Sequence, residues 1–294
     1  ASKGPTIALD AMGGDAAPEI VVCGAAIARE RFPDTRFLIF GGGDRVRSLI
    51  AENKALAAQA EYRDASTVIS ADAKASHALR TGRDSSMWRA LDAVKQGEAT
   101  AAVSAGNTGA LMAISKFVLR MPAGVDRPAM ASIMPTATGE TVMLDLGANL
   151  ECDADNLFQF AILGALFAHA TLAMDRPTVG LLNVGAEELK GSDTIKAAAQ
   201  MLRAREGQLP LRFAGFIEGD DIIGGKVDVV VTDGFSGNVA LKTAEGAASE
   251  VKQLTSGKSE VMLRVRQPRE LRGSGTGTDS GVLLPYPRCF TMDL

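Results

Sequence analysis

Residues 229–242 read VVVTDGFSGNVALK, an apolar run that ends in a short polar corner and continues as a helix-like pattern. Such a corner uses glycine for its backbone freedom and a small polar side chain to cap the following helix. The pattern recurs at residues 6–19, 101–112, 142–153 and 179–193. Repeated strand–corner–helix units predict an α/β fold, in which helices cover both faces of a mainly parallel sheet in three α/β/α layers.

The spacing of apolar residues predicts the elements between these corners. Strands are expected at residues 6–10, 36–40, 99–103, 178–183, 211–216 and 227–232. Helices are expected from about residue 18, after residue 107, and at residues 154–172, 192–204 and 237–254. Two strand-like runs, 129–134 and 141–146, flank a turn and predict an antiparallel hairpin. The apolar stretch 158–174 is read as a buried core helix or a subunit-interface helix, because it is short for a membrane span.

Size and composition narrow the class of protein. A chain of 294 residues can form one large α/β domain or two smaller ones. A net charge of −4 argues against nucleic-acid binding. Three scattered cysteines and two histidines argue against a disulfide scaffold and a multi-histidine metal site. With no apolar signal region at its start, the chain is expected to be cytoplasmic.

The corners supply most of the candidate functional groups. In a parallel sheet they gather along one edge, where α/β proteins bind ligands. Asp10, Asp15, Asp145 and Asp233 all lie at predicted strand ends. Each can cap a helix, orient a cationic side chain or hold Mg²⁺, and capping is the commonest fate of such residues.

The corner SAGNTGA, residues 104–110, is the most informative. Its glycines let the backbone approach a ligand, and Ser104, Asn107 and Thr108 offer hydrogen-bonding groups at a helix start, which suits phosphate or another oxyanion. The alternative is an ordinary helix cap. Lys190 and Lys242 follow two further corners and can neutralise an anion, or can be solvated surface charges.

Activated nucleophiles are scarce in this sequence. Cys152 follows a corner, but no nearby histidine can activate it. The run Gly41-Gly42-Gly43 does not meet the dinucleotide pattern, because Val46 stands where its last glycine should be. The scarcity of nucleophiles suggests a reaction in which one substrate attacks the other directly.

Six blocks in order, LDAMGGD, SSM (85–87), SAGNTGA, LDLGAN, NVGAEELKG and VTDGFSGNVALKTAEG, resemble the bacterial PlsX family of acyl-acyl-carrier-protein:phosphate acyltransferases. The resemblance covers residues 6–246. It implies attack of inorganic phosphate on the thioester of a long-chain acyl carrier protein. It also implies a Rossmann-like fold related to phosphotransacetylases and isocitrate dehydrogenases, a homodimer, peripheral contact with a membrane, and no metal or organic cofactor.

On this basis we expect phosphate at Ser104, Asn107 and Thr108 with Lys190 nearby, and the thioester beside Asn149, Asp233 and Asn238. The predicted catalytic residues are Asn107, Lys190, Asp233 and Asn238. The predicted substrate-binding residues are Asp10, Gly13, Gly14, Asp15, Ser104, Gly106, Thr108, Asp145, Asn149, Asn183 and Lys242.

The last part of the sequence departs from the family pattern. We therefore expect an acyltransferase domain over residues 1–256 and a divergent tail over residues 257–294. Two other functions stay open at this point. One is an oxidoreductase of the isocitrate dehydrogenase type, and the other is a binding module that keeps the fold without turnover.

Overall fold

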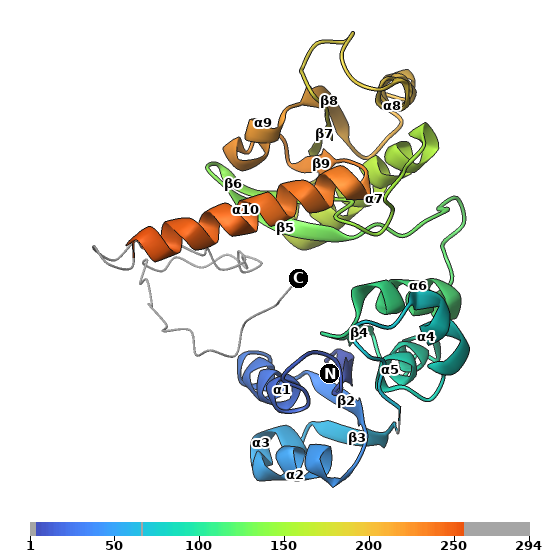
Figure 1. Cartoon of the computed structure of the whole chain (residues 1–294), viewed down its shortest axis with the longest axis vertical. Coiled ribbons are helices and arrows are strands. Elements are labelled where there is room, and N and C mark those ends of the chain that lie inside the picture. The colour runs from blue at the N-terminus through green and yellow to red at the C-terminus, as the bar shows by residue number, and fades with distance from the viewer. Residues whose placement is uncertain (1–3, 66, 256–294) are drawn as a thin grey trace. The chain divides into compact units, whose positions relative to one another are not determined.

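A computed structural model describes residues 4–65 and 67–255 (Figure 1). These residues form two compact units, which divide between Pro122 and Ala123. We call them unit 1 and unit 2 and describe each by itself. The expected acyltransferase domain draws on both units, and the expected tail lies outside the described residues.

Unit 1 contains a four-stranded parallel sheet in the order β3-β2-β1-β4. Its strands are β1 (Thr6–Asp10), β2 (Arg36–Gly41), β3 (Ala60–Asp64) and β4 (Ala101–Val103). Its helices are α1 (Glu19–Arg31), α2 (Asp44–Glu52), α3 (Lys54–Ala57), α4 (Ala75–Thr81), α5 (Ser86–Lys95) and α6 (Thr108–Leu119). Leu9 pairs with Val103, so the carboxyl ends of β1 and β4 are neighbours.

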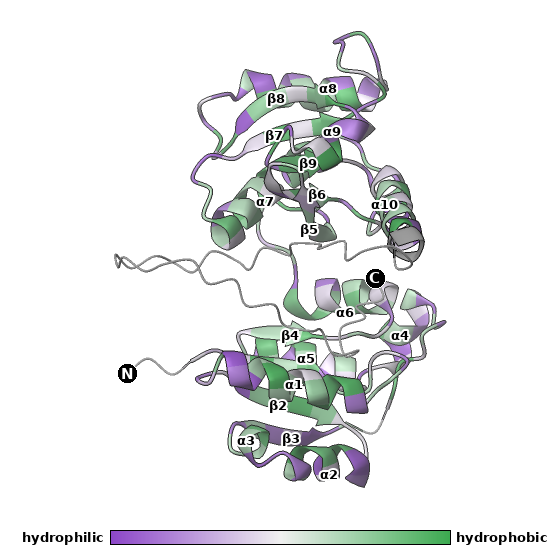
Figure 2. Ribbon diagram, turned by 90° about the vertical axis from the view of Figure 1, so that its left-hand side faces the viewer, coloured by the Kyte–Doolittle hydropathy of each residue, from purple (hydrophilic) through white to green (hydrophobic). Residues whose placement is uncertain are grey.

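Alternate residues of the unit 1 strands pack on opposite faces of the sheet, because successive side chains of a strand point to opposite sides. Leu9 and Ile39 belong to a cluster with apolar residues of α1, α2 and α3. Leu38 and Phe40 belong to a second cluster with Ala90 of α5. Helices therefore cover both faces of this sheet, and its inner strand β2 is largely hydrophobic in Figure 2.

Unit 2 contains a five-stranded sheet in the order β5-β6-β9-β7-β8. Its strands are β5 (Ala131–Thr136), β6 (Gly139–Leu144), β7 (Thr178–Leu182), β8 (Arg212–Ile217) and β9 (Val229–Val231). Its helices are α7 (Ala154–Leu172), α8 (Asp193–Ala204), α9 (Gly219–Gly224) and α10 (Gly234–Thr255). The pair β5–β6 is antiparallel, and the other pairs are parallel.

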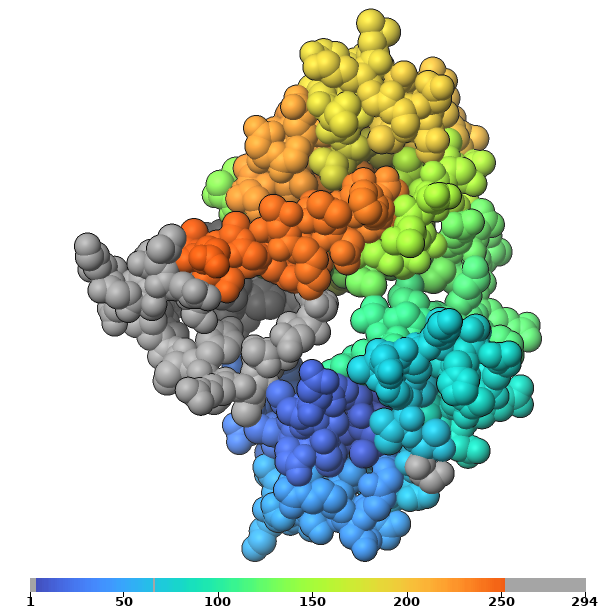
Figure 3. All heavy atoms as spheres, in the orientation of Figure 1, coloured from blue at the N-terminus to red at the C-terminus, as the bar shows by residue number. Residues whose placement is uncertain are grey.

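Two clusters of buried residues sandwich this second sheet. Leu144 and Val229 pack with Phe160 of α7 and with residues of α8. Val230 packs on the other side with Leu241 of α10 and with Ile222 of α9. Helix α10 lies on the surface of unit 2, where it appears orange in Figure 3.

Most predicted elements are confirmed. The hairpin is present as β5–β6, and the predicted helix 154–172 is α7 with the same bounds. Phe160, Ala161 and Ala168 of α7 are fully buried, so the reading as a core helix is confirmed. Within residues 4–65 and 67–255, no helix combines the length and the apolar character that a membrane crossing requires.

One expectation about the corners is wrong. The strands form two sheets, so the five corners do not share a single sheet edge. The corners after β1 and β4 belong to unit 1, whereas those after β6, β7 and β9 belong to unit 2. The pattern of each strand is local, but the choice of partner strand depends on residues far away in the sequence, so the corners alone could not reveal this division.

Candidate active-site corners

The first corner lies in unit 1, where β1 and β4 end side by side. Asp10 is the last residue of β1 and is 2% exposed. The Ser104 hydroxyl donates a hydrogen bond to Asp10 Oδ2 at 2.7 Å and accepts one from the Gly106 N–H at 3.1 Å. The Met12 N–H donates to Asp10 Oδ1 at 3.2 Å. The carboxylate of Asp10 therefore holds the two loops of this corner together.

Gly13 is required by the close approach of these loops. A Cβ at this position would lie 2.7 Å from the backbone nitrogen of Gly106, 2.8 Å from Asp10 Oδ2 and 3.0 Å from Ser104 Oγ. Those atoms are backbone or already hydrogen-bonded, so they cannot move aside easily. Gly14 has a φ of +95°, which favours glycine. Both glycines are thus explained by the geometry of the corner.

Asn107 caps α6 and also clamps a neighbouring segment. Its Oδ1 accepts from the Ala110 N–H at 2.8 Å. Its Nδ2 donates to the carbonyl oxygens of Ala71 at 2.7 Å and Ala73 at 3.0 Å. The amide is therefore engaged on both sides, which is a positioning role. Neither Ala71 nor Ala73 carries a sequence signal for this contact, because their backbone makes it.

The start of α6 still offers free donors. Among the described residues, no acceptor takes the backbone N–H groups of Thr108 and Gly109 in the first turn, or that of Gly13. The first N–H groups of a helix lack partners within the helix, and they carry the positive end of its dipole. An anion is the natural ligand for such a group of donors.

The second corner lies in unit 2 and is organised by Asp145, which is fully buried. Its Oδ1 accepts from the backbone N–H groups of Met130 at 2.9 Å, Gly147 at 3.3 Å and Ala148 at 3.0 Å. Its Oδ2 accepts from the Asn149 N–H at 2.7 Å and from Asn149 Nδ2 at 2.8 Å. Both carboxylate oxygens are thus surrounded by donors of the protein, so Asp145 positions the corner and does not face a substrate.

The N-terminus of α10 packs directly against this corner. The Gly234 N–H donates to the carbonyl oxygen of Asn149 at 2.8 Å, and Asn238 Nδ2 donates to that of Leu146 at 3.2 Å. Asp233 caps the helix, because its Oδ1 accepts from the Ser236 N–H at 2.7 Å. A side chain at Gly237 would overlap the backbone carbonyl oxygen of Asp145. The structure thereby brings Asn149, Asp233 and Asn238 together, as the sequence led us to expect.

The third corner follows β7 and is held by Asn183. Its Nδ2 donates to the carbonyl oxygens of Gly185 and Lys190, each at 3.1 Å, which closes the loop between them. Its Oδ1 is buried and has no hydrogen-bond partner among the described residues. The backbone of Gly191, with a φ of +91°, lies against the same side chain.

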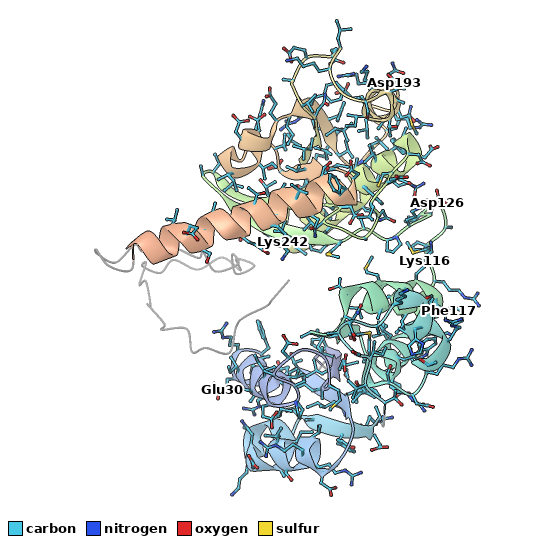
Figure 4. All side chains as sticks on the ribbon, viewed as in Figure 1. Glu30, Lys116, Phe117, Asp126, Asp193 and Lys242 are labelled. Atoms are coloured by element: carbon cyan, nitrogen blue, oxygen red, sulfur yellow. The ribbon has the colours of Figure 1, made fainter. Side chains whose placement is uncertain are left out.

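The two predicted lysines are exposed and form ion pairs. Lys190 Nζ lies 2.9 Å from Glu187 Oε2, and this hydrogen bond raises the pKa of Lys190. Glu187 was not among the predicted residues, although its spacing of three residues from Lys190 on a short turn is a usable signal. Lys242, labelled on α10 in Figure 4, lies 2.9 Å from Glu245 Oε2. The ammonium group of Lys190 therefore stays charged at neutral pH.

Lys190 was predicted to lie near the first corner, but the two belong to different units. Lys190 belongs to unit 2, whereas Ser104, Asn107 and Thr108 belong to unit 1. Asp15 is exposed and makes no hydrogen bond among the described residues. Pro128 and Met130 were missed, because they contribute only backbone groups to the second corner.

Cys152 is unsuited to covalent catalysis. Partial burial of the thiol raises its pKa to about 11, and the negative charge of Asp145 is a second, smaller cause. Its thiol donates to the carbonyl oxygen of Asn149 at 3.7 Å. A nucleophilic cysteine needs a depressed pKa. The geometry therefore agrees with a reaction in which one substrate attacks the other.

Comparison with known proteins identifies the family. The family model described as "Fatty acid synthesis protein" matches residues 5–265. A phosphate acyltransferase of Rhodospirillum rubrum is 54% identical over 252 residues, which cover 86% of this chain and 72% of that protein. A phosphate acyltransferase of Rhodospirillum centenum is 60% identical over 242 residues, which cover 82% of this chain and 68% of the relative.

Solved structures support the fold. The EutD phosphotransacetylase from Staphylococcus aureus aligns with a TM-score of 0.61 at 17% identity, over 84% of this chain and 83% of that chain. A phosphotransacetylase from Streptococcus pyogenes aligns with a TM-score of 0.63, also at 17% identity and with the same coverage. At this identity the likeness concerns the fold, and it confirms the predicted Rossmann-like α/β class. The chain therefore belongs to the PlsX family of fatty acid synthesis proteins and is an acyltransferase of fatty acid and phospholipid synthesis.

Proposed function

We propose that this protein transfers a long-chain acyl group from an acyl carrier protein to inorganic phosphate. A phosphate oxygen forms a bond to the thioester carbonyl carbon, and the carbon–sulfur bond then breaks. The thiol of the carrier leaves with the proton that hydrogen phosphate gives up, and the other product is acyl phosphate. The observation that carries this proposal is the high identity to phosphate acyltransferases over most of the chain.

The first corner is proposed to bind phosphate. The free N–H groups of Gly13, Thr108 and Gly109 can each donate to a phosphate oxygen, and the dipole of α6 favours the negative charge. Asp10 fixes the Ser104 hydroxyl, and Gly106 keeps the loop close enough for the backbone to reach the ligand. Asn107 supports this arrangement by positioning the start of α6.

The second corner is proposed to bind the thioester. Asn238 is exposed and carries an amide that can donate to the carbonyl oxygen as negative charge develops there. Asn149 and Asp233 set the position of Asn238 through the loop and the helix cap. Lys190 and Lys242 are proposed to neutralise oxyanion charge, since exposed ion pairs with Glu187 and Glu245 are weak enough to exchange.

We further propose a homodimer, a cytoplasmic location and a peripheral contact with membranes. These three properties are supported by the family membership, and no metal or organic cofactor is needed for the reaction as written. Phosphate is itself the nucleophile, so the protein has only to hold it, orient the thioester and stabilise the tetrahedral intermediate.

The decisive experiment mixes the protein with palmitoyl carrier protein and phosphate, and traps acyl phosphate with hydroxylamine. We expect hydroxamate that depends on phosphate. Asn107→Ala and Lys190→Ala should each lower turnover by roughly 100-fold, the scale of losing one preorganised group. Lys226→Ala is a matched control, because Lys226 forms an ion pair with Asp221 and is not among the predicted site residues. Binding of the carrier without hydroxamate would instead favour a non-catalytic module.

A further inference from the structure

Unit 1 carries an open groove that is not part of any of the three corners. It has a volume of about 670 Å³ and lies among α4, α5 and α6. Its lining residues are Leu79, Lys95, Ala113, Lys116, Phe117 and Arg120. Figure 4 labels Lys116 and Phe117 on α6. The groove thus combines an apolar floor with three cationic side chains, and none of its lining residues is acidic.

The aromatic residue of the groove, Phe117, contacts a buried ring of the same unit. Phe117 is 57% exposed. Its ring lies 5.6 Å from the ring of Trp88, at an angle of 54°, and Trp88 is only 8% exposed. Contact with a buried ring fixes the orientation of Phe117. An exposed aromatic side chain of fixed orientation is typical of the anchor residues of protein interfaces.

The charge of the groove is opposite to that of the protein as a whole. The chain has a net charge of −4, yet every charged residue that lines this groove is positive. Within the described part of the chain, neither Lys95 nor Arg120 forms an ion pair. A local field of this kind attracts an acidic partner and repels a basic one.

We propose that this groove docks an acidic amphipathic helix of the acyl carrier protein. An amphipathic helix laid into a groove presents apolar side chains to its floor and carboxylates to its rim. Here Phe117, Leu79 and Ala113 form the floor, and Lys95 and Arg120 meet the carboxylates. The groove is open to solvent, which suits a protein surface better than a single chain that must be enclosed. This inference rests on the proposed function, since that function makes the carrier a substrate.

The test is a double charge reversal, Lys95→Glu with Arg120→Glu, in the full chain. The matched control is Lys54→Glu with Arg36→Glu, which makes the same change of charge in unit 1 outside the groove. Binding of fluorescein-labelled carrier is measured by anisotropy, and turnover is measured with palmitoyl carrier and with palmitoyl pantetheine. We expect about tenfold weaker binding and about tenfold higher KM for the carrier in the groove variant. Turnover of palmitoyl pantetheine should not change.

Several outcomes would overturn the docking site. Unchanged carrier binding in the groove variant would do so, as would an equal loss in the control. A different result is a groove variant that keeps carrier binding and no longer floats with phosphatidylglycerol vesicles. That result would assign the groove to binding of an anionic lipid surface. No binding of carrier by the wild type would also reject it. If the wild type binds carrier through the groove but yields no hydroxamate, the proposed function fails and the docking surface stands.

Discussion

Asp145→Asn keeps the size and shape of the side chain almost unchanged, but it should destabilise the second corner. The substitution replaces one of two acceptor oxygens with an amide that can only donate. Of the two orientations of the asparagine side chain, the less costly one keeps the oxygen at Oδ1 with its three backbone donors. It places the new NH₂ group opposite Asn149. The N–H and Nδ2 groups of Asn149, at 2.7 and 2.8 Å from Oδ2, would then face another donor.

The expected cost follows from these two lost bonds. A hydrogen bond to a charged group contributes about 1.5 to 3 kcal/mol, and the donors left behind are buried. Since Asp145 has no exposed surface, water cannot replace the lost acceptor without opening the corner. We therefore expect a local destabilisation of about 3 to 6 kcal/mol. Because 1.4 kcal/mol is a factor of ten, protection against amide exchange should fall by about 10² to 10⁴.

Hydrogen exchange measured by mass spectrometry suits this test, because the affected amides are known. A peptide that spans residues 128–150 contains the N–H groups of Met130, Gly147, Ala148 and Asn149. Peptides from β1 and β2 in unit 1 serve as an internal reference. Asp233→Asn is the matched control variant, because asparagine caps a helix about as well as aspartate does.

Two results would refute this reasoning. Protection of residues 128–150 within threefold of wild type would mean that Asp145 does not hold the corner. An equal loss of protection in Asp233→Asn would mean that any change of charge near α10 has the same effect. In either case the assignment of Asp145 as a positioning residue would be wrong.

Further predictions concern the first corner and the cysteine. Gly13→Ala should weaken phosphate binding by about 10- to 100-fold in a calorimetric titration, because the new methyl group collides with Asp10 and Ser104. Gly24→Ala in α1, where a Cβ meets nothing within 4 Å, should instead stabilise the protein by about 0.5 to 1 kcal/mol in urea unfolding. Cys152→Ala should keep wild-type turnover. Alkylation of Cys152 by iodoacetamide should accelerate tenfold per pH unit from pH 7 towards about 11, since its raised pKa keeps the thiol neutral below that value. A plateau near pH 8 would contradict this.

Local features of the chain were predictable because their causes lie within a few residues. Ser85, Asn107 and Asp153 each cap a helix with a side chain that accepts from an N–H three residues ahead. The hairpin β5–β6 could be recognised from two apolar runs around a short turn. By contrast β3, with the sequence AEYRD, was missed, because three of its five residues are charged and only Ala60 and Tyr62 pack against the core.

The sequence also marked the candidate residues, but it did not reveal the hydrogen-bond partners of their side chains. Asn107 carries an amide suited to phosphate, yet the carbonyl oxygens of Ala71 and Ala73 occupy its donors. Asp145 looks like a ligand-binding carboxylate until its five donors are counted in the folded protein. A side chain's partners depend on which segments lie beside it, and that information is spread along the whole chain.

By itself, the sequence determined the α/β class, the corners and their glycines, because turn geometry and helix caps involve only neighbouring residues. Only the tertiary structure decided that the strands form two sheets and that Ser104 meets Asp10, which is 94 residues away. Strand pairing and buried hydrogen bonds are non-local, because they are settled by the packing of the whole unit. The same packing fixed which polar groups are used within the protein and which stay free for a ligand.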